Sequence, residues 1–375
     1  MAGIYLHIPF CKSKCHYCDF HKSTSLYDKS LIIKTLKTEL TKRVDYIKGE
    51  VVNTIYLGGG TPSLLSIEEL TDILNHIGGL FEISRDAEVT LEANPDDLTK
   101  AYCRELRSIG FNRLSIGIQS FQQDDLAIMN RRHSAEQARQ AVQIAQQEGF
   151  SNISIDLIYG LPNMTTERWK MNLEEAFKLN IQHISAYHLT YHQGTLFYDY
   201  LKQGKIKQVP EDDSFKQFEM LIEQAKEYGF IHYEISNFAL EGYYSKHNSS
   251  YWLGEKYLGI GPSAHSFDGV SRQWNVANNN EYISAIAQDK SYFEIEKLSD
   301  DDRFNDYIIT SLRTIWGLSI KHIQEKFGDR YVKHVDSMVR KYAHSGDIIK
   351  EGDSIKLTTK GLFISDQLMM EFMAD

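Results

Sequence analysis

The sequence predicts an α/β protein made of repeated βα units, followed by a smaller α+β domain. Three observations lead to this fold class. Short apolar runs alternate six times with amphipathic helical segments over about the first 230 residues. The connections are short, which is typical of parallel strands joined by right-handed crossovers. After residue 299, three helical patterns are followed by two strand-like runs separated by Glu-Gly-Asp.

The six units follow one another in order. The predicted strands are residues 4–8, 53–59, 88–94, 113–120, 152–162 and 183–189. The predicted helices are residues 27–47, 66–79, 99–109, 122–129, 134–148, 165–179 and 210–228. Ser66 followed by Glu69 is typical of a helix capping box. An open doubly wound sheet and a full or partial barrel both fit this order, and in each of them ligands bind at the carboxyl ends of the strands.

The regular alternation ends at about residue 230. Residues 230–295 are rich in Tyr, Asn, Ser and Gly and show little periodicity. Helical patterns at 300–314, 319–326 and 329–344 precede the two strand-like runs, which indicates a winged-helix-like domain. We therefore expect three regions. They are a βα domain over 1–235, a connecting region over 236–297 and a C-terminal winged-helix-like domain over 298–375.

Composition excludes several classes of function. The formal net charge is −10, whereas nucleic-acid binding needs a basic surface, and residues 299–375 contain no strong basic run that would favour a DNA-binding regulator. No apolar run approaches the 18 or more residues of a transmembrane helix. The stretch MAGIYLHIPF lacks the features of a signal peptide. We expect a cytoplasmic protein, and peripheral contact with the inner membrane stays open.

Three of the four cysteines lie close together in CKSKCHYCDF. Cys11, Cys15 and Cys18 have the spacing C-x3-C-x2-C, which indicates metal or cluster binding rather than a disulfide framework. Zinc would need a fourth ligand such as His16 or His21, and structural zinc sites usually contain a second cysteine pair. A [4Fe–4S] cluster is the better interpretation, because three thiolates leave one iron open for an exchangeable ligand. The fourth cysteine, Cys103, has the helical spacing of a buried apolar residue.

Polar residues end several of the predicted strands. GGGTPS at 58–63 follows the second strand, where glycines let the backbone approach a ligand, although an ordinary strand-to-helix turn also fits. Taken one at a time, the other polar residues are more simply explained as solvated or capping groups. At the ends of apolar strands they need partners, which favours one shared site. They are Glu92 in LEANP, Gln119 in GIQSF, Arg131 in MNRRHS and Asp156 in SIDLIYGLP.

The spacing C-x3-C-x-aromatic-C, after a first strand and before six βα units, resembles the radical S-adenosylmethionine (SAM) superfamily. This resemblance implies a partial (β/α)6 barrel of the TIM type. It also implies a [4Fe–4S] cluster held by the three clustered cysteines, SAM bound to the open iron, and an electron donor for the cluster. The positions that match the family's SAM-binding residues are Tyr5, Gly59, Gly60, Thr61, Glu92, Gln119, Arg131 and Asp156.

The match is closer to one branch of that superfamily. YLHIPFCKSKCHYCDF, YLGGGTPS, LEANP, SIGIQSF, DLIYGLP and the C-terminal module look like the coproporphyrinogen dehydrogenase (HemN)-like branch, which also contains heme chaperones. The dehydrogenases carry a further cysteine where this chain has Phe20, and an extension before the first strand. Here KHNSSYW (246–252) matches the chaperones' H-N-x-x-Y-W motif. His16, where Pro is frequent, and Asn130, where Gly is frequent, depart from the family pattern.

The resemblance therefore implies a chaperone that binds heme and passes it to an acceptor hemoprotein, such as a respiratory one at the membrane. His247 suits heme iron as an axial ligand, with Tyr251 and Trp252 flanking the porphyrin, although a structural aromatic cluster also fits. Which of the 14 histidines binds iron is open. The alternative function is a radical enzyme that decarboxylates coproporphyrinogen III without oxygen. A homodimer is also open.

Overall fold

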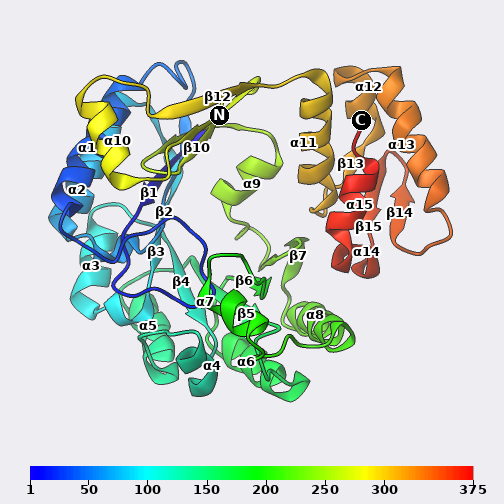
Figure 1. Cartoon of the computed structure of the whole chain (residues 1–375), viewed down its shortest axis with the longest axis horizontal. Coiled ribbons are helices and arrows are strands. Elements are labelled where there is room, and N and C mark those ends of the chain that lie inside the picture. Colours follow the sequence, from blue (N-terminus) through cyan, green and yellow to red (C-terminus); the bar gives the residue numbers. More distant parts are fainter. Residues whose placement is uncertain (375) are drawn as a thin grey trace.

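The computed structural model describes residues 1–374 and confirms the α/β fold with a smaller α+β unit at the C-terminal end (Figure 1). Six strands pair in parallel in the order β1-β2-β3-β4-β5-β6. Their bounds are β1 Ala2–Ile8, β2 Val52–Gly59, β3 Ile83–Ala93, β4 Arg113–Gln119, β5 Ile153–Tyr159 and β6 His183–His188. The carboxyl ends of all six strands therefore meet at one edge of the curved sheet.

Helices follow each of these strands. They are α1 Lys29–Lys42, α2 Ile67–Leu80, α3 Lys100–Ser108, α4 Gln123–Ile128, α5 Ala135–Gln147, α6 Thr166–Lys178, α7 Leu196–Lys202 and α8 Glu211–Glu227. The capping box of α2 is present as predicted: Ser66 Oγ accepts a hydrogen bond from the Glu69 backbone, and Glu69 Oε2 accepts one from the Ser66 backbone. The helices bury the apolar side chains of the strands, such as Ile4 and Leu6, in the main core.

In these strands, residues that alternate with the apolar core residues are polar. Arg113, Ser154 and His183 are buried and line a cavity of about 50 Å³ together with Glu92 and Asp156. Because side chains alternate between the two faces of a strand, the helix-covered face is apolar and the opposite face carries these polar groups. The carboxylates at the strand ends therefore lie above a polar interior.

Residues 230–297 contain more regular structure than the sequence predicted. β7 Ile231–Glu234 and β8 Asn237–Ala239 extend the sheet beyond β6. β9 Lys256–Ile260 pairs in parallel with β1, and β10 His265–Phe267, β11 Ser271–Asn275 and β12 Phe293–Lys297 continue beyond it. α9 Lys246–Trp252 and α10 Asn279–Ala287 lie between them. Strands of three to five residues are too short to show a clear period, which is why the sequence did not reveal them. The boundaries at 235 and 297 stay a prediction.

The C-terminal unit has a hydrophobic cluster of its own, which includes Phe304, Ile308 and Phe372. Its elements are α11 Asp300–Leu312, β13 Leu318–Ser319, α12 Ile320–Lys326, α13 Asp329–Lys341, β14 Ile348–Glu351, β15 Ser354–Leu357, α14 Thr359–Phe363 and α15 Ser365–Phe372. The three strands form one antiparallel sheet in the order β13-β15-β14. Arg313, after α11, donates to buried Glu234 of β7 over 2.7 Å and so joins the two parts.

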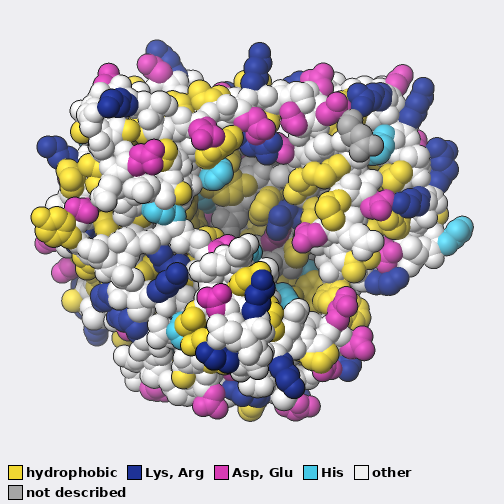
Figure 2. Space-filling view, viewed as in Figure 1, with side chains coloured by type: hydrophobic (Ala, Val, Ile, Leu, Met, Phe, Trp, Pro, Cys, Tyr) yellow, Lys and Arg dark blue, Asp and Glu magenta, His cyan; other side chains and the backbone are white. Residues whose placement is uncertain are grey.

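The surface shows no single dominant charge on the face drawn in Figure 2, where Lys and Arg are interspersed with Asp and Glu. That face is hollowed at its centre, between the large sheet and the C-terminal unit. Within residues 1–374, no helix combines the length and the apolar character that crossing a membrane would require.

A buried carboxylate ties the added strands to the first helix. Glu39 of α1 is fully buried and accepts hydrogen bonds from the Tyr282 hydroxyl at 2.5 Å and from the Gly261 backbone and Asn275 side chain at 2.8 Å each. The Arg43 guanidinium lies 3.6 Å away. Burial raises the pKa of Glu39, and these donors oppose the rise. A buried charge needs such partners, so this cluster fixes residues 261–282 against α1.

We expect Glu39→Ala to lower the free energy of unfolding by about 3 kcal/mol, because four polar partners lose their shared acceptor inside the protein. Urea denaturation followed by circular dichroism measures the change. Glu105→Ala, at an exposed position of α3, is the matched control and should change stability by less than about 0.5 kcal/mol. Equal stability of the two variants would contradict this role for Glu39.

Candidate functional site

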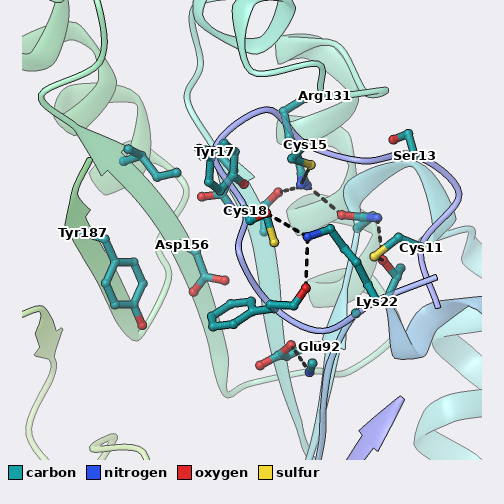
Figure 3. A pocket seen from close by; sticks show the side chains of 18 of the residues that line it. Cys11, Ser13, Cys15, Tyr17, Cys18, Lys22, Glu92, Arg131, Asp156 and Tyr187 are labelled. Carbon is teal, nitrogen blue, oxygen red and sulfur yellow. Dashed lines mark hydrogen bonds between the residues drawn. The ribbon is translucent and has the colours of Figure 1, made fainter. Parts of the chain in front are cut away.

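The three clustered cysteines lie on the loop between β1 and α1, which crosses the carboxyl edge of the sheet (Figure 3). Backbone hydrogen bonds hold the loop at both ends. Cys11 N donates to Ser23 O over 3.0 Å, and Gly60 N donates to Ile8 O over 2.9 Å. His16 N donates to Met129 O over 3.1 Å, which attaches the middle of the loop to the end of α4. The loop is thus fixed to β2 and to the segment after β4.

The thiols face hydrogen-bond donors. Cys11 Sγ accepts from Thr61 Oγ1, and Cys15 Sγ accepts from Arg131 Nη1, each over 3.3 Å. Burial raises the pKa of the Cys11 thiol, and the Thr61 hydroxyl opposes that rise. Donors and a guanidinium beside sulfur favour the thiolate, which is the form that binds iron. In this structure the sulfurs accept these hydrogen bonds, and no three His, Cys, Asp or Glu side chains among residues 1–374 are gathered at metal-binding distances.

One cavity of about 410 Å³ joins most of the residues singled out from the sequence. It opens beside the cysteine loop, with Glu92 and Asp156 on the strands behind it (Figure 3). The structure thus brings together side chains from the loop after β1 and from the ends of β2, β3, β4 and β5. The predicted residues that line the cavity are Cys11, Cys15, Cys18, Gly59, Gly60, Thr61, Glu92, Gln119, Arg131 and Asp156.

Two carboxylates behind the cavity have raised pKa values. Glu92 accepts from the Tyr56 hydroxyl at 2.7 Å and from the Gly59 backbone at 3.1 Å, yet burial raises its pKa to about 7. Asp156 accepts from the Ser115 hydroxyl at 3.3 Å, and burial raises its pKa to about 6. Both groups thus change charge near neutral pH, where they can accept from a hydroxyl or pair with a cation.

The glycines at the end of β2 do more than leave space for a ligand. Gly59 has a φ of 99°, and a Cβ there would lie 2.5 Å from the His7 ring. A Cβ on Gly60 would lie 2.6 Å from the Phe10 carbonyl oxygen. Both glycines are therefore required for close packing of β2 against the chain leaving β1. Gln119 at the end of β4 has a φ of 70°, which is strained for a residue other than glycine, and it also lines the cavity.

Asn94 is a site residue that sequence reasoning missed. Its side-chain oxygen accepts from Arg131 Nη2 over 2.7 Å, and its Nδ2 donates to Thr61 Oγ1 over 3.3 Å. Asn94 thus connects the donors that face Cys11 and Cys15. The signal was available, because Asn94 lies in LEANP at the end of a strand, beside the Glu92 that was selected.

The two departures from the family pattern lie opposite each other. The His16 ring and the Ile128 carbonyl oxygen share a hydrogen bond of 2.8 Å at Nδ1. Asn130 has a φ of 58°, which asparagine tolerates, and its Nδ2 donates to the Lys14 carbonyl oxygen over 2.9 Å. Both side chains attach the cysteine loop to the segment that carries Arg131. Neither departure removes a cavity residue.

Tyr5 and His247 lie outside this cavity. The His247 ring is 1% exposed and stacks on Tyr56, with ring centroids 5.0 Å apart. Thr54 Oγ1 lies 2.7 Å from Nδ1, and the Tyr251 hydroxyl lies 2.7 Å from Nε2. Burial lowers the pKa of His247 to about 3. Because both ring nitrogens are hydrogen-bonded, His247 offers no free nitrogen to iron in this structure. His247, Tyr56 and Tyr251 instead form a structural aromatic cluster.

Two family models match the chain. The Radical SAM superfamily model matches residues 5–176, and the HemN C-terminal domain model matches residues 298–364. The heme chaperone HemW of Bacillus subtilis is 32% identical over 380 aligned residues that cover all of both chains. The heme chaperone HemW of Escherichia coli is 36% identical over 70% of this chain and 69% of its own.

Relatives also extend to a eukaryote and to a solved structure. A mitochondrial protein of Danio rerio, Radical S-adenosyl methionine domain-containing protein 1, is 34% identical over 70% of this chain and 60% of its own. The structure of coproporphyrinogen III oxidase (HemN) from Escherichia coli matches with a TM-score of 0.86 and 24% identity, over 100% of this chain and 90% of that one. At this identity the match shows a shared fold.

The raised pKa of Glu92 predicts a pH dependence of stability. The native chain holds the Glu92 proton more tightly than the unfolded chain, whose pKa is near 4.5. The contribution of Glu92 to the free energy of unfolding is therefore fully present below about pH 4.5 and is lost as the pH rises to about 7. At about 1.4 kcal/mol for each pKa unit, the loss is roughly 3 kcal/mol.

Urea denaturation of the ligand-free chain at about pH 5 and about pH 7.5 tests this sign. Glu92→Gln, which does not titrate, should lose less stability over that range than the wild type. Glu105→Gln, at an exposed position, is the control and should behave as the wild type. A Glu92→Gln variant with an unchanged pH dependence would be evidence against a raised pKa.

Proposed function

The chain belongs to the radical SAM superfamily, in the branch of the heme chaperones HemW, and from this premise we propose that it is itself a heme chaperone. It holds a [4Fe–4S] cluster and SAM, binds heme and passes it to an acceptor hemoprotein. The observation that carries the proposal is the cavity in which three free thiols meet the polar ends of four strands.

The residues fit a cluster held by three thiolates. Cys11, Cys15 and Cys18 would bind three of its irons, which leaves one iron open. The Thr61 hydroxyl and the Arg131 guanidinium already face two of the sulfurs and would offset their negative charge. When bound, the cluster would supply a site for SAM and a one-electron redox centre fed by a separate electron donor.

The same cavity fits SAM. Glu92 and Asp156 offer carboxylates to its ribose hydroxyls or its amino group, and Arg131 offers a guanidinium to its carboxylate. Gly59, Gly60, Thr61 and Gln119 line the wall between these charges. Tyr5 lies below, where its hydroxyl is 3.2 Å from His7 Nδ1 and its ring stacks on Tyr56. Tyr5 thus supports the segment beneath the cavity, and its contact with SAM stays a prediction.

Heme enters the proposal through the relatives named heme chaperones. On this proposal the chain works in the cytoplasm and meets its acceptor, a respiratory hemoprotein, at the inner membrane. The proposed assembly is a homodimer. The alternative is oxygen-independent decarboxylation of coproporphyrinogen III, and Phe20 in place of a further cysteine counts against it.

Replacing all three clustered cysteines by serine should abolish both iron–sulfur content and SAM binding, because no other thiol lines the cavity. Iron and sulfide analysis after anaerobic reconstitution, together with equilibrium dialysis of SAM, measures the loss. Cys103→Ser is the matched control, since its buried thiol lies in α3 outside the cavity. SAM binding that survives the triple substitution would contradict the proposed site.

The reconstituted chain should bind heme saturably, near one heme per chain, and should not convert coproporphyrinogen III. Absorbance titration measures the first, and anaerobic turnover with SAM and a reductant measures the second. Transfer to an apo-hemoprotein can be followed by the spectrum of the product. Formation of protoporphyrinogen IX would instead establish the radical enzyme.

A further inference from the structure

The structure narrows the choice of histidine that could bind heme iron, and this inference rests on the proposed function. An axial ligand needs a ring nitrogen that is free of hydrogen bonds and reachable by a flat, wide porphyrin. His247 meets neither condition, as its hydrogen bonds and burial show. Three other histidines line the cavity, namely His133, His188 and His192.

Two of these three, His133 and His188, fit these conditions less well than His192. His133 is 1% exposed, and its Nε2 shares a hydrogen bond of 3.0 Å with the Ile118 carbonyl oxygen. Its free Nδ1 is buried, so a porphyrin cannot reach it. His188 Nε2 shares a hydrogen bond of 3.1 Å with the Ser214 hydroxyl, and its half-buried ring packs edge-on against Tyr159, which leaves a porphyrin less room than at an exposed ring. Of the three histidines that line the cavity, His192 is the most exposed.

His192 has the geometry of a metal ligand with a carboxylate behind it. It follows β6 at the carboxyl edge of the sheet, and its side chain is 48% exposed. Nδ1 lies 3.4 Å from Asp19 Oδ2, whereas Nε2 has no hydrogen-bond partner within residues 1–374. A carboxylate facing one ring nitrogen is the arrangement that orients metal-binding imidazoles and makes the other nitrogen a stronger ligand. The hydrogen bond from Thr195 Oγ1 to the His192 carbonyl oxygen, at 2.6 Å, fixes the local turn.

The same cavity wall offers apolar surface for a porphyrin. Phe20 is 66% exposed and Tyr187 is 44% exposed, and both line the cavity with His192. Large aromatic side chains left this open to water indicate a surface that a flat apolar ligand would cover. Phe20 follows Asp19 directly, so one short segment after Cys18 supplies both the carboxylate and an aromatic ring.

A cation suited to a heme propionate lies on the same wall. Lys22 lines the cavity, and its Nζ donates to the carbonyl oxygens of Cys18 at 3.0 Å and Phe20 at 3.2 Å. No carboxylate within residues 1–374 pairs with this ammonium group. Its charge is therefore available to an anion.

We infer that His192, oriented by Asp19, is the axial ligand of the heme iron, and that the porphyrin lies against Phe20 and Tyr187 at the mouth of the cavity. Heme then sits beside the cysteine loop, because Asp19 and Phe20 directly follow Cys18. The exposed ring at position 20 thereby has a function of its own, in the place where the dehydrogenases carry a further cysteine.

Absorbance titration with heme of the full, anaerobically reconstituted chain tests the inference. His192→Ala should weaken heme affinity at least tenfold and change the Soret and visible bands, because the imidazole ligand is lost. Added free imidazole should restore the ligated spectrum in His192→Gly. Asp19→Asn should weaken affinity by a few fold. His344→Ala is the control, because His344 is exposed on the C-terminal unit, and it should bind heme as the wild type does.

The outcomes separate this inference from the proposed function. If the wild type shows no saturable heme binding, the proposed function fails and the inference with it. If the wild type binds heme and His192→Ala binds it with unchanged affinity and spectrum, the inference is wrong and the chaperone function stands. Iron and sulfide content and circular dichroism of each variant show whether cluster and fold are intact, and the imidazole rescue reports ligation independently of both.

Discussion

The site depends on one half-buried cation, the guanidinium of Arg131. Its Nη1 donates to Cys15 Sγ, and its Nη2 donates to the Asn94 side-chain oxygen and to the Gly117 carbonyl oxygen at 2.7 and 2.6 Å. One rigid, planar group thus connects the cysteine loop to the ends of β3 and β4. A lysine carries its three donors on a single nitrogen and lacks the planar fork, so it cannot reach these separate acceptors together in the same way. The remaining donor, Nε, is buried without a partner, which leaves capacity for an anionic ligand.

The polar inner face of the sheet imposes a second constraint. Buried polar groups need partners. Several of these partners come from the segment KHNSSYW (246–252). The backbone amides of Lys246 and His247 donate to Glu88 at 3.2 and 3.1 Å, and Thr54 bonds to the His247 ring. α9 therefore covers the end of this face opposite the cavity, and Trp252 at its end lies under Arg313, 4.1 Å from ring centroid to guanidinium carbon. The motif thus connects the sheet interior to the C-terminal unit.

The elements of the fold that were predicted share one property: each has a hydrophobic period that can be read within its own segment of the sequence. The strands from β1 to β6 and the helices between them each carry enough apolar residues to display a period. The strands β7 to β12 do not, because they are short and are stabilised by pairing with the edges of a sheet that already exists. Partners far apart in sequence, such as Glu39 and Tyr282, hold them in place, and no local pattern reveals such pairs.

The sequence by itself determined the six βα units, the cysteine spacing and the polar residues that end the strands, because parallel strands bring their carboxyl ends together. Tertiary structure decided what each of these residues contacts. It placed His247 inside the protein with both nitrogens bonded, and it set His192 beside Asp19 at the cavity, although 173 positions separate those two residues in the chain. Burial and the direction of a side chain depend on the packing of distant segments. Residue type and spacing therefore indicate which chemistry is present, and packing determines which groups are free to perform it.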